Sequence, residues 1–249
     1  MNKSKYRFTK PKSIGILVTL VVMLFIGVTT FYPNQTTSLV NGNTSVETYT
    51  LEDIPEYTGK PYVTLNKNEP VFTDADMTSI EQEVYSELDS LGRCGTAFAK
   101  VGKETMPTEK RGSIGMIKPS GWHTVKYDIV NGKYLYNRCH LIGYQLTGEN
   151  ANPKNLITCT RYMNTVGMLE FENQVAAYAK ETGNHVLYRV TPIFQGNNLV
   201  ASGVQIEAQS LEDNGAGIHF NVYVYNIQEG IDIDYATGKS HLIQKENSQ

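Results

Sequence analysis

The chain has 249 residues, with 22 lysines and arginines against 25 acidic residues. Hydrophobic residues make up 40% of it, which excludes an intrinsically disordered chain, and three cysteines are too few for a disulfide scaffold. A single domain of about 200 residues buries roughly 70–75% of the surface that its unfolded chain exposes, so it needs neither a structural metal nor a disulfide to form a core.

The N-terminal segment has the pattern of a membrane address. Five cations and no acid lie in residues 1–12, and residues 13–32 are uncharged and mostly aliphatic. About 19 apolar residues, at 1.5 Å each in a helix, approach the ~30 Å of a bilayer core. We therefore predict a cytoplasmic basic segment at 1–12 and a transmembrane anchor at 13–32, with the rest of the chain outside. A cleaved signal peptide and a buried core helix are the alternatives, and the lack of an A-x-A-like site disfavours cleavage.

The remaining chain divides by composition and charge. Residues 33–50 are rich in Ser, Thr and Asn, which predicts a flexible linker, and a folded domain is expected at residues 51–249. Residues 33–249 carry 17 cations and 25 acids, a net charge of −8, but residues 93–140 alone have a net charge of +6. This cationic band is a candidate surface for a polyanion, although a solvated charged face would give the same pattern.

The hydrophobic pattern predicts an α+β domain with a mainly antiparallel sheet. Ile80, Val84 and Leu88 are spaced four apart, which favours an amphipathic helix at 79–91. Alternating and β-branched runs indicate strands, and Gly196, Asn197 and Asn198 suit a hairpin turn. The other expected elements are strands at 133–141, 156–160, 185–194, 199–207 and 218–227, and a helix at 163–182 that ends at Gly183.

The cysteines and most histidines carry little functional signal. Cys94, Cys139 and Cys159 are odd in number and far apart, so no disulfide framework can be read from them. We interpret Cys139 as a small buried hydrophobic residue, with a redox switch as the alternative. There is no C-x-x-C pair, and a structural role is the default for His123, His185, His219 and His241.

One cluster of residues has the pattern of a hydrolytic site. On a strand at 133–141, Arg138 and His140 project from the same face, where a guanidinium and a titratable base meet. An imidazole can accept a proton from water near neutral pH, and a guanidinium can bind phosphate oxygens. A Mg²⁺ ion held by one or two oxygen ligands and several waters would complete such a site. The combination suits phosphodiester cleavage.

The helix at 163–182 offers two more candidates. Asn164 heads its inward-facing stripe, where an amide needs a partner, either a ligand or a backbone group. Glu172 lies at the edge of the stripe, whereas Glu170 faces solvent. Continuous α-helix would place Glu172 about 12 Å along the axis from Asn164. Either the helix breaks near Gly167, or Glu172 acts through water.

These residues resemble a known site. The segments Asn137-Arg138-Cys139-His140, Asn152-Pro-Lys-Asn155 and Tyr162-Met163-Asn164, followed by Glu172, are similar to the ββα-metal motif of the DNA/RNA non-specific endonucleases, the D-R-G-H nucleases. With its N-terminal segment, the chain looks like the membrane-anchored DNA-entry nucleases and exported DNases of Gram-positive bacteria. The resemblance covers roughly residues 90–235.

The resemblance implies a role for each matching residue. His140 would be the general base, Asn164 the protein ligand to Mg²⁺, for which Mn²⁺ can substitute, and Asn155 and Glu172 would position the waters of the metal. Arg138 would contact phosphate, with Arg111 as a second phosphate-binding arginine. Products would carry 5′-phosphate ends.

Two positions depart from the family pattern. The Asp of the D-R-G-H motif is Asn137 here, and its Gly is Cys139. An amide can hydrogen-bond but supplies no negative charge, so electrostatic support of Arg138 or His140 from this position is lost. We expect activity to survive, because the aspartate does not react.

The expected protein is an extracellular, membrane-tethered endonuclease without sequence preference that hydrolyses DNA and, as an open possibility, RNA. DNA-uptake machinery is a candidate partner, and the oligomeric state is open. Two alternatives are a non-catalytic surface module that captures DNA and a structural envelope protein that binds anionic wall polymers.

Overall fold

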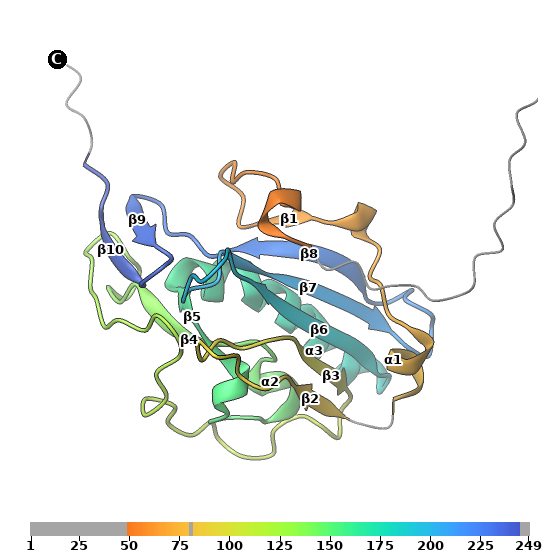
Figure 1. Ribbon diagram of the computed structural model, residues 1–249. Coiled ribbons are helices and arrows are strands. Elements are labelled where there is room, and N and C mark those ends of the chain that lie inside the picture. Colours follow the sequence, from red (N-terminus) through yellow and green to blue (C-terminus); the bar gives the residue numbers. More distant parts are fainter. Residues whose placement is uncertain (1–48, 80–81, 245–249) are drawn as a thin grey trace, which may run out of the picture. The chain divides into compact units, whose positions relative to one another are not determined.

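The computed structural model describes residues 49–79 and 82–244, and these form a mixed α/β fold around an antiparallel sheet (Figure 1). The six-stranded sheet has the order β1-β8-β7-β6-β3-β2, and every neighbouring pair is antiparallel. Two hairpins, β4–β5 and β9–β10, form separate two-stranded sheets. In the described part of the chain no helix is long and apolar enough to span a bilayer. The predicted basic segment, the anchor and nearly all of the linker lie outside the described residues.

The elements have the following bounds. The strands are β1 Tyr62–Thr64, β2 Glu83–Tyr85, β3 Ala97–Val101, β4 Tyr136–His140, β5 Leu156–Thr160, β6 Val186–Ile193, β7 Gly203–Ser210, β8 His219–Tyr225, β9 Ile231–Asp234 and β10 Lys239–Leu242. The α-helices are α1 Asp74–Thr78, α2 Tyr144–Thr147 and α3 Leu169–Thr182, with a π-helix at Met163–Met168 and 3₁₀ turns at Leu51–Asp53, Asn66–Asn68 and Pro153–Asn155.

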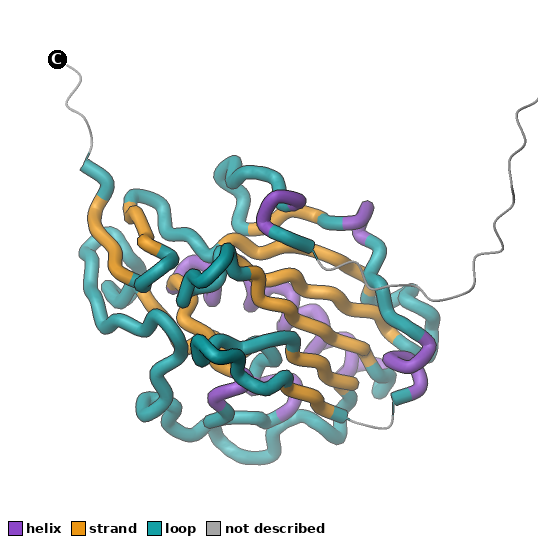
Figure 2. The backbone as a smooth tube through the Cα atoms, viewed as in Figure 1, coloured by secondary structure: helices purple, strands orange, loops and turns teal. Residues whose placement is uncertain are grey.

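Helix α3 covers one face of the sheet and closes the main core. Figure 2 shows α3 running behind the strands. Its buried residues Phe171, Val175 and Ala179 follow the helical period, and the Phe171 ring lies 4.9 Å from that of Phe220 on β8. Burial of this apolar stripe, and not helix propensity alone, fixes α3 against the sheet. The helix ends at Gly183, which has the left-handed conformation of a C-terminal cap, as predicted.

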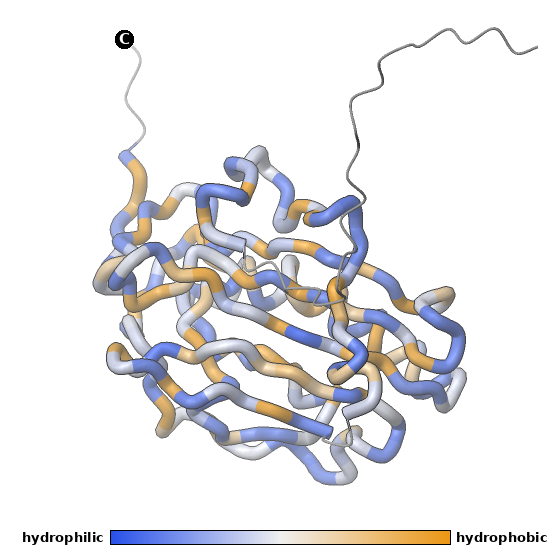
Figure 3. The backbone as a smooth tube through the Cα atoms, turned by 45° about the vertical axis from the view of Figure 1, so that its right-hand side comes forward, coloured by the Kyte–Doolittle hydropathy of each residue, from blue (hydrophilic) through white to orange (hydrophobic). Residues whose placement is uncertain are grey.

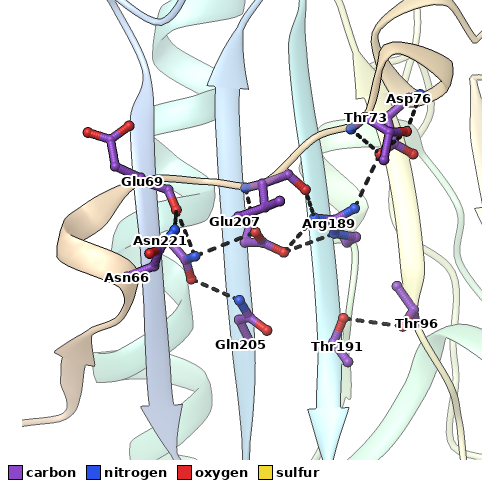
Figure 4. Close-up of polar contacts among 11 residues, drawn as sticks. Asn66, Glu69, Thr73, Asp76, Thr96, Arg189, Thr191, Gln205, Glu207 and Asn221 are labelled. Atoms are coloured by element: carbon purple, nitrogen blue, oxygen red, sulfur yellow. Dashed lines mark hydrogen bonds and ion pairs between the residues drawn. The ribbon is translucent and has the colours of Figure 1, made fainter. Parts of the chain in front are cut away.

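The opposite face of the sheet carries a buried polar network. Arg189 on β6 and Glu207 on β7 lie side by side and form an ion pair of 2.8 Å, and Arg189 also contacts Asp76 on α1 at 3.4 Å (Figure 4). Glu207 accepts a hydrogen bond from the Val71 main chain, and Arg189 donates one to the Val71 carbonyl. Hydrophilic residues accordingly interrupt the hydrophobic colouring of the strands in Figure 3. The network attaches the segment that precedes β2 to the centre of the sheet.

The β4–β5 hairpin, the π-helix and α3 form the ββα unit. In its register Arg138 pairs with Thr158 and His140 with Leu156. Cys139 and Cys159 form a disulfide across the two strands, with a Cα–Cα distance of 5.9 Å. The interpretation of Cys139 as an unpaired hydrophobic residue was therefore wrong. Spacing along the chain could not reveal a diagonal neighbour that only the strand register brings close.

The predicted helix at 79–91 was also wrong. Glu83–Tyr85 form the edge strand β2 and pair with β3, and Val84 and Leu88 are exposed, so the four-residue spacing marks no buried face. Pairing with a sheet edge overrides local helix preference here. The other predicted elements are present, although β4 begins later than expected and β7 is shifted toward the C-terminus.

We predict that Glu207→Gln lowers the free energy of unfolding by roughly 3–5 kcal/mol, because it leaves the buried Arg189 without its closest carboxylate. Urea unfolding of the two proteins measures the difference. Glu87→Gln is the control, since the Glu87–Lys154 pair is exposed and should contribute about 1 kcal/mol or less. Equal losses in the two variants would show that the buried pair has no special role.

Replacing both Cys139 and Cys159 by Ala should cost about 3 kcal/mol, since the disulfide closes a loop with a sequence separation of 20. Thermal unfolding with and without dithiothreitol measures this effect. The reductant should lower the melting temperature of the parent and leave that of the double variant unchanged. A parent protein insensitive to dithiothreitol would contradict the disulfide as a stabilising link.

Candidate active site

The ββα unit brings the sequence-predicted residues to one cavity. Arg138 and His140 come from β4, Asn164 from the π-helix and Glu172 from α3, and together with Arg111 from a loop they line a cavity of about 220 Å³. We refer to it as the His140 cavity. Five of the six predicted site residues therefore lie around one cavity.

The His140 imidazole is buried and both of its nitrogens are engaged. Nε2 lies 2.8 Å from the carbonyl oxygen of Asn150, which can only accept, so we assign the ring proton to Nε2. Nδ1 is then an acceptor and lies 3.1 Å from Nη2 of Arg111. Burial, assisted by the Arg111 charge and opposed by the Asn150 hydrogen bond, lowers the pKa of His140 from its ordinary 6.5 to about 4. The imidazole is therefore neutral at neutral pH.

The two arginines have different surroundings. Arg138 donates hydrogen bonds to the carbonyls of Gly115 and Ile117, and its guanidinium lies 3.9 Å above the ring of Trp122. These contacts hold the loop that follows Arg111 against β4 and leave part of the Arg138 fork for a ligand. Arg111 is exposed. Its side chain is thus free to exchange His140 for an anion.

The helix that carries Asn164 changes from π to α winding near Gly167, where the sequence suggested a break in the helix. Residues Met163–Met168 form a π-helix before α3 begins. Gly167 lies so close to β8 that an added Cβ would come within 2.3 Å of Val224, so the backbone approach requires glycine there. Among the described residues the Asn164 side chain makes no hydrogen bond. The Asn164 amide lines the His140 cavity and is available to bind a ligand there.

Glu172 lies on the far wall of the same cavity. Its carboxylate is 3.4 Å from Nε2 of Gln145 and lies beside Gly143, where an added Cβ would come within 2.6 Å of Oε2. Burial raises the pKa of Glu172 to about 7, although the Gln145 contact and the Arg111 charge oppose this. Glu170, two residues earlier, is exposed as predicted.

Asn155 is not brought into the cavity. It is completely buried, its Oδ1 accepts a hydrogen bond from the Ile142 main-chain N–H at 2.8 Å, and its Nδ2 donates to the Ile142 carbonyl at 3.0 Å. This geometry favours a role in fixing the turn after β4 over the expected contact with waters of a metal. Asn137 lines a larger neighbouring cavity.

Sequence reasoning missed three contributors to the site. Gln145 on α2 contacts Glu172, Gly143 makes room for that carboxylate, and Asn150 orients His140. Asn150 acts through its carbonyl, which every residue possesses, so its side chain gave no signal. The short helix α2 could have been suspected from the left-handed Gly148 that ends it.

The comparison with known families agrees with this geometry. The model of the DNA/RNA non-specific endonucleases matches residues 74–212, more than half of the chain. The chain belongs to this family. The expected ββα-metal nuclease fold is confirmed, and the protein is a metal-dependent nuclease of mixed α/β architecture.

Solved structures of nucleases resemble this endonuclease over most of their length. The structure of NucA from Streptococcus agalactiae with magnesium bound is 27% identical in sequence, with a TM-score of 0.65. The match covers 76% of this chain and 89% of the NucA chain. Without metal, it matches at a TM-score of 0.67 and covers 78% and 92%. The Sda1 nuclease with a bound zinc ion is 28% identical, covers 75% of this chain and 97% of its own, and has a TM-score of 0.58.

The donor set of this endonuclease fits a hydrated divalent cation. Asn164 offers an uncommitted amide and Glu172 a carboxylate, both oxygen donors of the kind that Mg²⁺ prefers. The described residues contain no group of three or more His, Cys, Asp or Glu that could hold a metal. A cation that keeps most of its waters matches such a sparse set better than a fully protein-ligated one.

The raised pKa of Glu172 predicts a stability effect of Glu172→Gln in EDTA. The unfolded carboxyl ionises near pH 4.5 and the folded one near 7, so folding is penalised progressively between these values and fully above pH 7. The full penalty at pH 8 is about 3 kcal/mol, and 1 kcal/mol corresponds to roughly 2–4 °C for a domain of this size. The variant should therefore melt roughly 6–12 °C higher than the parent at pH 8 and equally at pH 4.

Glu170→Gln on the same helix is the matched control and should show no such pH dependence. The protonation of His140 affects parent and variant alike and cancels in the comparison. If Glu172→Gln gave the same shift at pH 4 as at pH 8, the carboxylate would not be the group responsible.

Proposed function

We propose that this endonuclease uses His140 as a general base to hydrolyse phosphodiester bonds of DNA without sequence preference, outside the cell membrane. The observation that carries the proposal is the imidazole itself. It is neutral, its Nε2 proton is held by Asn150, and its Nδ1 lone pair faces a cavity shared with two arginines and the Asn164 amide. A base, phosphate-binding cations and a metal donor then act at one place.

Binding of the substrate would expose the base. In the free protein Arg111 occupies the Nδ1 lone pair, and a phosphate offers this guanidinium a charged, bidentate acceptor instead. Movement of Arg111 to the phosphate leaves Nδ1 open to a water molecule. The negative charge of the phosphate also opposes the causes that lower the pKa of His140, which makes the imidazole a better base.

The bond changes follow from this arrangement. Nδ1 of His140 accepts a proton from water, the water oxygen forms a bond to phosphorus, and the bond from phosphorus to the 3′ oxygen breaks. The product strand then carries a 5′-phosphate, and the 3′ oxygen takes a proton from solvent. Mg²⁺ bound by Asn164, with Glu172 and water, would neutralise charge on the leaving oxygen. Arg111 and Arg138 bind the phosphate oxygens.

Two features support activity outside the cytoplasm. The Cys139–Cys159 disulfide suits an oxidising compartment. The cationic residues 1–12 and the apolar residues 13–32 suit an anchor with the nuclease domain on the outer side. Since the contacts available at the site address the phosphate and not the edges of bases, sequence preference should be weak.

We expect His140→Ala in the full chain to lower the Mg²⁺-dependent rate of plasmid cleavage by 10²-fold or more, because general-base catalysis contributes roughly 10²–10⁴. Gel electrophoresis of supercoiled DNA over time measures the rate, and a parallel assay on RNA defines the substrate range. His123→Ala is the control, since His123 is exposed and its one hydrogen bond among the described residues is with the Thr237 carbonyl. A His140→Ala protein that cuts DNA as fast as the control would exclude His140 as the base.

A further inference from the structure

A second cavity adjoins the catalytic one and has no role in the mechanism above. It has a volume of about 480 Å³, and we call it the Trp122 cavity. It shares Arg111, Arg138 and Asn164 with the His140 cavity, so the two lie next to each other. A chain bound at the catalytic residues would therefore extend into it.

The Trp122 cavity is built for an anion. Arg161, which directly follows β5, joins Arg111 and Arg138 in its lining, and no acidic side chain of the described residues lines it. Nε of Arg161 is buried and has no hydrogen-bond partner, and within the described residues its guanidinium forms no ion pair. A buried donor without a partner is rare in folded proteins and costs free energy unless a ligand satisfies it.

Aromatic side chains stand beside these cations. Trp122 lines the cavity, with the Arg138 guanidinium on its ring, and Tyr134 is 46% exposed and lines the same space. The faces of such rings stack on bases of single-stranded nucleic acid without regard to sequence, at roughly 1–3 kcal/mol per base. Trp122 is half-buried, and Nζ of Lys126 lies 4.5 Å from the centre of the Tyr134 ring. Cations beside a half-buried and an exposed aromatic ring match a nucleotide, which has both a phosphate and a flat apolar ring.

We propose that the Trp122 cavity binds the nucleotide next to the cleaved bond, with Arg161 on its phosphate and Trp122 and Tyr134 against its base and sugar. This subsite rests on the proposed nuclease function and extends it. The cavity would hold a strand whose scissile phosphate lies at Arg111 and His140. Cleavage would then favour strands with a nucleotide on that side of the bond over terminal phosphates.

Trp122 makes the subsite directly observable, because it is the single tryptophan of the chain. The full chain is titrated in EDTA, where cleavage is absent, with a six-nucleotide oligothymidylate, and tryptophan fluorescence is recorded. Binding should change the fluorescence of the parent, and Arg161→Gln should weaken binding about tenfold, equivalent to 1.4 kcal/mol. The slope of log affinity against log salt should fall by about 0.7, as expected for one lost phosphate contact.

Matched variants separate the subsite from general electrostatics. Lys133→Gln removes a neighbouring exposed cation whose only ion pair among the described residues is with Asp128, and it should bind as the parent does. Arg161→Lys keeps the charge and should recover part of the affinity. In Mg²⁺-dependent cleavage Arg161→Gln should raise KM and leave kcat within about twofold. Its melting temperature without nucleic acid should be equal to or above that of the parent, whereas loss of a merely structural residue would lower it.

Three outcomes would overturn the proposal. These are an unchanged Trp122 signal at saturating oligothymidylate, equal affinities of Arg161→Gln and Lys133→Gln, and inorganic phosphate that gives the same fluorescence change and affinity as the oligonucleotide. The last would identify a site for an anion alone. Failure of the subsite is separable from failure of the proposed function, because the binding measurement needs no cleavage and loss of activity in His140→Ala needs no Arg161.

Discussion

One hydrogen bond, from Nε2 of His140 to the carbonyl oxygen of Asn150, determines which ring nitrogen faces the catalytic cavity. Because a carbonyl can only accept, it fixes the tautomer without adding charge, and burial keeps the ring neutral. The carbonyl raises the pKa of the imidazole only enough to oppose burial in part, whereas the charge of a carboxylate in the same place would raise it further. The replacement of the family aspartate by Asn137 is compatible with this design, since the orientation of His140 depends on a main-chain group of another loop.

The electrostatic character of the site differs from that of the chain as a whole. The part beyond residue 32 has a net charge of −8, yet Arg111, Arg138 and Arg161 gather around the two adjoining cavities. Arg138 is anchored by loop carbonyls and by Trp122, whereas Arg111 is exposed and Arg161 has no partner among the described residues. Arg138 therefore holds the loop against β4 and keeps part of its guanidinium for a phosphate, and Arg111 and Arg161 have theirs available as well. This local concentration of positive charge attracts a polyanion, while the acidic residues elsewhere on the domain repel the polyanion. Binding should therefore be sensitive to salt.

The sequence predicted the features that follow from the spacing of residues along one strand or helix. It missed the features that depend on which strands pair with each other. Alternation along a strand placed Arg138 and His140 together, and helical spacing separated Glu172 from Glu170. The edge strand at Glu83–Tyr85 and the Cys139–Cys159 bond follow from strand register, which no local pattern encodes. Asn155 matched a family motif, but its amide is used by the Ile142 main chain. Arg161 gave no signal in the sequence, because what distinguishes it is a buried Nε without a hydrogen-bond partner among the described residues, which only the structure can reveal.

The π-helix at Met163–Met168 makes the position of Asn164 depend on chain length as well as on side-chain chemistry. A π turn arises when one extra residue is inserted into an α-helix and the backbone winds more widely to accommodate it. Deletion of a single residue between Asn164 and Leu169 would restore regular winding and leave α3 packed on the sheet. It would also rotate everything before it by about 100° around the axis. The fold would tolerate such a deletion far better than catalysis would, so this short stretch should resist length variation even where its residue types are free to change.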